Sequence, residues 1–75
     1  MGSKYPVLRP SEIIKVLDKL GFQKVSQRGS HVKFRRTGNP SRSTIIPMHD
    51  EVAKGTLKSI LEQADISLEE FLRML

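Results

Sequence analysis

Residues 28–36 read RGSHVKFRR, and the apolar positions in this segment follow the period of a strand. Two apolar residues, Val32 and Phe34, stand at alternate positions. The residues around them are polar: His31, Lys33 and Arg35. Alternation of this kind is typical of a strand with one buried and one solvent-facing side. The segment therefore predicts a strand over residues 31–36 that turns a row of basic side chains to the solvent.

Turn-forming residues bound this strand at both ends. Gly29-Ser30 precede it, and the loop sequence GNPS at residues 38–41 follows it. Glycine accepts positive φ and proline has no amide proton to donate, so both sequences favour turns. Residues 22–27 and 43–47 then predict a first and a third strand, which would complete an antiparallel sheet.

Helical periodicity appears on both sides of these strands. Ser11 is a good N-cap for a first helix, and Gly21 is a good residue to end it. The apolar stripe of that helix is Ile13, Val16, Leu17 and Leu20. A second helix follows Gly55-Thr56, and its apolar stripe is Leu57, Ile60, Leu61 and Ala64. These stripes have the spacing of helices that pack one face against a core.

A short third helix is predicted near the end of the chain. Ser67 and Glu70 have the S-x-x-E spacing of a capping box. Asp65 lies where the chain must turn between the last two helices, a position that glycine would occupy more easily. The apolar residues of this helix are Phe71, Leu72 and Leu75. They either complete the core or form an exposed anchor for a partner.

The predicted order is a helix, a three-stranded antiparallel sheet, a helix and a short extra C-terminal helix. This order defines a small α+β domain with its helices on one face of the sheet. Because 75 residues are enough for one such domain, we expect a single domain over residues 1–75, with residues 1–8 loosely ordered.

Positive charge is concentrated in the middle of the chain. The net charge is +5, but residues 19–49 contain seven Lys and Arg residues and no acid. Residues 50–75 carry six acids against three bases. A basic block beside an acidic tail is typical of a surface that faces phosphates. The alternative is a solvated basic face without a ligand.

Several classes of protein are excluded. The chain has no cysteine, so disulfides, a cysteine nucleophile and thiolate zinc sites are ruled out. It has no apolar run long enough to span a membrane and no apolar N-terminal signal, so we expect a cytoplasmic protein without a membrane role. The motifs of phosphate loops, dinucleotide folds, zinc proteases and serine hydrolases are also missing. We therefore expect no small-molecule cofactor and no metal.

His31 is the side chain best placed to carry out chemistry. Histidine can accept or donate a proton near neutral pH. Lys33 and Arg35 share its strand face and could hold a phosphate beside it, with Arg28 as a third cation. Gly29 directly before Ser30-His31 would let a backbone approach closely.

His49 is the second candidate, because it follows the third predicted strand. Pairing Arg36 with Ser43 would place His31 opposite Met48, so the two imidazoles would lie at one edge of the sheet. His49 could then be a second acid or base, a phosphate contact, or a histidine that hydrogen-bonds a loop. A metal site of His31, His49, Asp50 and Glu51 has no supporting ligand spacing.

Taken together, the motifs resemble the HicA toxin family of mRNA interferases from about Ser11 to the end of the chain. The motifs are GF at 21–22, GSHVKF at 29–34, IPMH at 46–49, KGTL at 54–57, IL at 60–61, IS at 66–67 and EF at 70–71. The resemblance implies a fold like a double-stranded-RNA-binding domain, ribosome-independent cleavage of mRNA, and neutralisation by a HicB-like antitoxin. It also implies that His31 is catalytic. Asp65 departs from the glycine common before Ile-Ser in that family.

The combined interpretation is a metal-independent endoribonuclease. In this interpretation His31 takes the 2′-hydroxyl proton, and cations offset charge on the phosphorane. The RNA-binding candidates are Arg28, Gly29, Ser30, Lys33, Arg35 and, as an open question, His49. Two other classes stay open: a non-catalytic RNA-binding module and a protein-interaction domain with an incidental basic surface.

Overall fold

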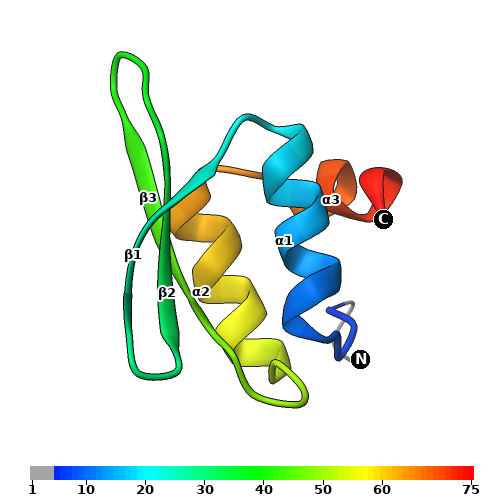
Figure 1. Ribbon diagram of the computed structural model, residues 1–75. Helices are drawn as coiled ribbons and strands as arrows, with labels where there is room; N and C mark the ends of the chain where they lie inside the picture. The colour runs from blue at the N-terminus through cyan, green and yellow to red at the C-terminus, as the bar shows by residue number, and fades with distance from the viewer. Residues whose placement is uncertain (1–4) are drawn as a thin grey trace.

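The computed structural model describes residues 5–75 and has the predicted α+β architecture (Figure 1). Its elements are α1 (Pro10–Lys19), β1 (Gln23–Arg28), β2 (His31–Arg36), β3 (Arg42–Pro47), α2 (Lys54–Ala64) and α3 (Leu68–Met74). The order of one helix, three strands and two helices confirms the fold class predicted from the sequence.

The three strands form one antiparallel sheet in the order β1-β2-β3. All three helices lie on one side of this sheet, so its opposite face is free of helices (Figure 1). We call this free side the outer face; it carries Arg28, His31, Lys33, Arg35 and Ile45. β1 is an edge strand whose six residues are all exposed.

The core fills the space between the sheet and the helices. It consists of Leu8, Ile13, Val16, Leu17, Phe22, Val32, Phe34, Ile46, Val52, Leu57, Ile60, Leu61, Ala64, Ile66 and Phe71. Both predicted helical stripes belong to it except for Leu20, which is half-buried and packs against it. β2 contributes Val32 and Phe34, as the alternation predicted.

The register between β2 and β3 differs by one residue from the predicted one. Arg36 pairs with Arg42, and His31 pairs with Pro47. A shift of one residue exchanges the two sides of a strand. As a result Thr44 and Ile46 face the core, while Ile45 faces the solvent.

Thr44 can be buried in this register because its hydroxyl has a partner. Its Oγ1 donates a hydrogen bond of 2.9 Å to Oε1 of Gln63 at the end of α2. A buried hydroxyl without a partner would cost about 1–3 kcal/mol, so this contact removes the main penalty for turning Thr44 inward. The prediction from sequence did not anticipate that a polar residue would occupy the core side of β3.

The first helix begins earlier than predicted. Arg9 is its N-cap and Pro10 its first residue, so the prediction of Ser11 as the cap was wrong. Proline suits the first helical position because its missing amide proton has no partner there in any case. The side chain of Glu12 accepts a 3.0 Å hydrogen bond from the Arg9 amide, which closes this end of the helix.

The segment before α1 is joined to the rest of the domain. The amide of Val52 donates a 2.7 Å hydrogen bond to the carbonyl of Leu8, and both side chains are buried. The predicted loosely ordered segment, residues 1–8, lies partly outside the described residues. Within the described part, Leu8 belongs to the core cluster.

The turn between α2 and α3 is left-handed, as the position of Asp65 predicted. Asp65 has φ 59° and ψ 47°, and its carboxylate lies 3.4 Å from the guanidinium of Arg42. Aspartate tolerates this conformation better than most residues with a side chain. The ion pair gives the aspartate a contact with β3 that glycine could not make.

α3 completes the core instead of standing free. The hydroxyl of Ser67 accepts a 3.1 Å hydrogen bond from the Glu70 amide, which confirms the predicted cap. Phe71 is fully buried, so the idea that it forms part of an exposed anchor was wrong. Leu72 and Leu75 are 40% and 53% exposed and remain available at the surface.

Replacing Phe71 with alanine should therefore destabilise the whole domain. Removal of a buried phenylalanine typically lowers the free energy of unfolding by about 3–5 kcal/mol. Leu72→Ala on the same helix is the matched control, and we expect it to cost at most about 1 kcal/mol. Urea unfolding of both variants measures the difference, and equal costs would contradict the placement of Phe71 in the core.

Candidate active site

The outer face of the sheet brings together four of the predicted site residues: Arg28, His31, Lys33 and Arg35. His31, Lys33 and Arg35 are exposed on β2, whereas Val32 and Phe34 between them are buried. Arg28 of β1 pairs directly with His31 across the first hairpin. Directly paired residues on neighbouring strands have side chains on the same side of the sheet. Arg28 and His31 are therefore neighbours on the solvent side.

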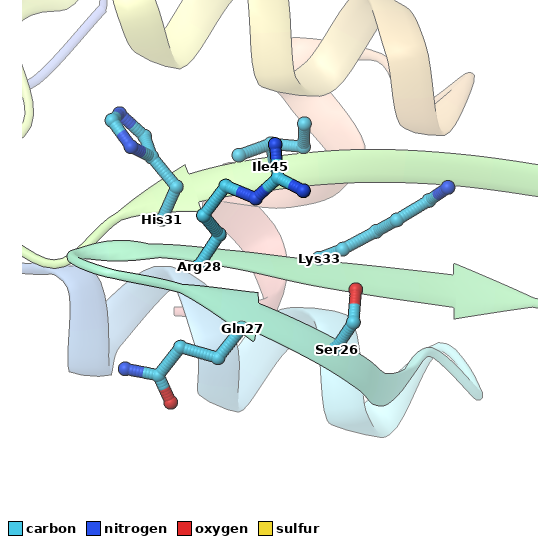
Figure 2. Close-up of a pocket in the computed structure, with 6 residues that line it drawn as sticks. All are labelled: Ser26, Gln27, Arg28, His31, Lys33 and Ile45. Atoms are coloured by element: carbon cyan, nitrogen blue, oxygen red, sulfur yellow. The ribbon is translucent and has the colours of Figure 1, made fainter.

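These residues line an open hollow of about 610 Å³ on the outer face (Figure 2). Its lining residues are Ser26, Gln27, Arg28, His31, Lys33 and Ile45. Figure 2 shows the side chains of Arg28, His31 and Lys33 on the same side of the sheet, with Gln27 pointing away. The hollow is therefore a surface of two cations and an imidazole around an apolar residue, Ile45.

The tight turn between β1 and β2 fixes Arg28 beside His31. Gly29 has φ 58°, the left-handed conformation that two-residue hairpin turns require at their first position. The Nε2 of Gln27 donates a 3.0 Å hydrogen bond to the carbonyl of Gly29. The Nζ of Lys24 donates in turn to Oε1 of Gln27 at 2.9 Å. This chain of contacts holds the turn from the side opposite the hollow.

His49 lies at the same edge of the sheet as His31, as the sequence predicted. Their ring centroids are 6.3 Å apart, and the ring planes are nearly perpendicular, at 86°. The amide of Met48 donates a 2.6 Å hydrogen bond to the carbonyl of Ser30, which joins the two segments that carry the histidines. The predicted proximity is confirmed although the strand register was one residue off.

The structure divides the basic block into two groups. Four of its cations contact other parts of the protein: Lys19 donates to the Met74 carbonyl, Lys24 donates to Gln27, Arg36 lies over the Phe22 ring, and Arg42 pairs with Asp65. Arg35 makes a long hydrogen bond of 3.5 Å to the Ser41 hydroxyl. Within residues 5–75, neither Arg28 nor Lys33 has a side-chain hydrogen bond or an ion pair. Among the described cations of this block, the two without such a contact are therefore the two that line the hollow.

Neither a metal cluster nor a membrane helix occurs in the described part of the chain. Residues 5–75 contain no group of three or more His, Asp or Glu side chains that could hold a metal ion. No helix among them is long and apolar enough to cross a membrane.

Sequence reasoning missed three residues that line the hollow: Ser26, Gln27 and Ile45. Ile45 could not be separated from Ile46 without the register of β3. Gln27 could have been noticed, since an amide two residues before a turn glycine can reach the carbonyl of the turn. Ser26 carries no signal of its own in the sequence.

The fold and the hollow define a small α+β domain whose open sheet face presents imidazole and cationic side chains to an anionic ligand. Residues 10–66 match the model of a protein family described as the HicA toxin of bacterial toxin-antitoxin. The chain therefore belongs to the HicA toxin family and has the role of the toxin in such a system. The comparison with curated proteins gives no match. The matched region includes the whole sheet and both long helices, and α3 lies beyond it.

The positive φ of Gly29 predicts how a substitution in this turn changes the stability of the domain. A methyl group added at Gly29 would meet no atom within 4 Å, so Gly29→Ala changes only the backbone preference. Alanine in a left-handed conformation costs about 1–2 kcal/mol, and we expect this loss in the free energy of unfolding.

Gly55 is the matched control, because a methyl group there also meets no atom within 4 Å. It lies in the first turn of α2, where alanine fits, so Gly55→Ala should stabilise the domain by about 0.4–1 kcal/mol. We expect the two substitutions to change the free energy of unfolding in opposite directions. A stabilising effect of Gly29→Ala would contradict the turn geometry.

Proposed function

We propose that this toxin is a ribosome-independent mRNA interferase, an endoribonuclease that acts in the cytoplasm and is neutralised by a HicB-like antitoxin. One observation carries the proposal: an exposed imidazole, His31, lies beside two cations, Arg28 and Lys33, that have no partner among residues 5–75. Membership of the HicA toxin family supports the same conclusion, because a toxin must damage something that the cell needs.

The chemistry required for RNA cleavage matches these side chains. His31 would take the proton from a 2′-hydroxyl, so that the 2′-oxygen attacks the adjacent phosphorus. Arg28 and Lys33 would hold the phosphate and offset the negative charge that develops on it. The products would be a 2′,3′-cyclic phosphate and a free 5′-hydroxyl. A positioned acid or base of this kind contributes about 10²–10⁴-fold to the rate.

RNA would be bound mainly through its phosphates. Stacking of bases requires exposed aromatic rings. Phe22, Phe34 and Phe71 are all buried, and the outer face carries no aromatic ring other than imidazole. Binding through phosphates makes the affinity fall steeply as the salt concentration rises. For a single strand, a plot of log K against log salt concentration has a slope of about −0.7 for each phosphate contact. Arg35, at the end of β2, would extend this surface along the strand.

A HicB-like antitoxin would block the toxin most effectively on the same surface. Covering the outer face would remove both the base and the cations that hold the phosphate. Because like charges opposed across an interface cost several kcal/mol, an antitoxin surface that reaches this face should be acidic. Leu72 and Leu75, which are exposed on and after α3, could provide a second, apolar contact.

Purified protein should cleave RNA in excess chelator and leave 2′,3′-cyclic phosphate ends. In this mechanism the general base and the groups that stabilise negative charge are all side chains, so removal of metal ions should not stop cleavage. His31→Ala should lower the rate by at least about 10²-fold while the variant stays folded and binds RNA as before. Gel analysis with mapping of the product ends, together with unfolding and binding curves, provides the measurement.

The possible outcomes separate the alternatives. Normal cleavage by His31→Ala would show that His31 is not the base. RNA that is bound but stays intact with the unmodified protein would favour a non-catalytic RNA-binding module. Loss of cleavage in chelator alone would contradict the metal-independent mechanism.

The double variant Lys33→Glu with Arg35→Glu should weaken both RNA cleavage and antitoxin binding. It replaces two positive charges on the outer face with negative ones, so an acidic antitoxin should bind at least about tenfold more weakly. Lys15→Glu with Lys58→Glu makes the same change in net charge on the helices and serves as the control. If titration gives unchanged antitoxin affinity for the first variant, inhibition acts through another surface.

A further inference from the structure

We propose that His49 is a second catalytic residue, which donates a proton to the leaving 5′-oxygen while His31 accepts the proton of the 2′-hydroxyl. This inference rests on the proposed function and deepens it. Its starting point is the geometry of the two imidazoles, whose centroids lie 6.3 Å apart in an edge arrangement.

Two separate parts of the fold bring these rings together. His31 begins β2, and it pairs with Pro47 at the end of β3. His49 follows two residues later, and the bond from the Met48 amide to the Ser30 carbonyl, 2.6 Å long, holds that segment against the first hairpin. A backbone hydrogen bond one residue before His49 thus holds the segment that carries it against the first hairpin.

The separation of the rings suits one phosphodiester. Cleavage moves protons at two oxygens bound to the same phosphorus, the entering 2′-oxygen and the departing 5′-oxygen. Each imidazole must reach its oxygen through a hydrogen bond of about 2.7–3.2 Å, so rings on the order of 6 Å apart can flank a single phosphate. A single imidazole would have to leave one of the two oxygens to solvent.

Both imidazoles are free for this task. Within residues 5–75, neither His31 nor His49 has a side-chain hydrogen bond or an ion pair, and both are exposed. A histidine with a structural role commonly hydrogen-bonds a backbone carbonyl or a carboxylate through one of its nitrogens. The neighbouring carboxylates, Asp50 and Glu51, form no ion pair with either ring. The contact that His49 does make is with the other histidine.

Each cleavage transfers one proton to the protein and one proton from it. The 2′-hydroxyl proton passes to neutral His31 as the bond from the 2′-oxygen to phosphorus forms. The bond from phosphorus to the 5′-oxygen breaks, and this oxygen takes a proton from protonated His49. His31 is left protonated and His49 neutral, and exchange with water restores both. Arg28 and Lys33 face the same hollow as His31 and would bind the two non-bridging oxygens.

A leaving group that needs no proton tests this role. The substrate is a short RNA whose cleavage position has been mapped with the unmodified protein, made with either oxygen or sulfur at the bridging 5′-position. A thiolate departs without a general acid. His49→Ala should therefore lose about 10²–10⁴-fold in rate on the oxygen substrate and stay within about tenfold of the unmodified protein on the sulfur substrate.

Two further variants complete the comparison. His31→Ala should be slow on both substrates, because the base is needed whichever atom leaves. Glu51→Gln, two residues after His49 and likewise exposed, should behave as the unmodified protein on both. Unfolding curves for all variants verify that each one is folded.

Each remaining outcome overturns the inference in a recognisable way. An equal loss on both substrates would show that His49 binds RNA or supports the site without donating the proton. No loss on either would show that His49 takes no part, while the proposed function would still stand. If the unmodified protein cleaves no RNA, so that no cleavage position can be mapped, the proposed function itself fails, and this inference fails with it.

Discussion

Burial of Val32 and Phe34 against the helical layer determines which side of β2 faces the solvent. Because side chains alternate along a strand, that burial turns His31 and Lys33 outward. Arg28 faces the solvent as well, because the two-residue turn at Gly29 pairs it with His31. The hollow on the outer face is therefore a consequence of core packing on the opposite side, and any shift of β2 by one residue would bury its charges.

The same packing explains why a strongly basic middle block does not act as one uniform surface. Arg36 lies 5.2 Å from the centre of the Phe22 ring, and Arg42 forms an ion pair with Asp65. These cations join β2 and β3 to residues that follow α1 and α2. Arg28 and Lys33 have no such contact and Arg35 has only a long one, so part of the basic block faces the solvent without a partner among residues 5–75.

Most features that depend on local periodicity and turn chemistry were predicted from the sequence, with the Ser11 cap as the exception, whereas a feature that tertiary contacts decide was not. The strand alternation, the Gly29 turn, the Ser67 cap and the left-handed Asp65 were all predictable from neighbouring residues. The register of β3 was not, because two adjacent isoleucines fit either side and the Gln63 partner that allows Thr44 inside is distant in sequence. That error did not affect the predicted placement of Arg28, His31 and Lys33 on one face, because this placement depends on β1 and β2 alone. His49 also lies near His31 as predicted, since a shift of one residue moves the end of β3 only slightly.

A crystal structure of the protein with an RNA that carries a 2′-O-methyl group at the cleaved position would examine the outer face as the site of RNA cleavage. The blocked nucleophile keeps the RNA whole without any change to the protein. We expect the phosphate beside the methyl group to lie in the hollow, within hydrogen-bond distance of Arg28 or Lys33 and next to His31. RNA bound instead across α1 and α3, with the outer face uncovered, would contradict this assignment.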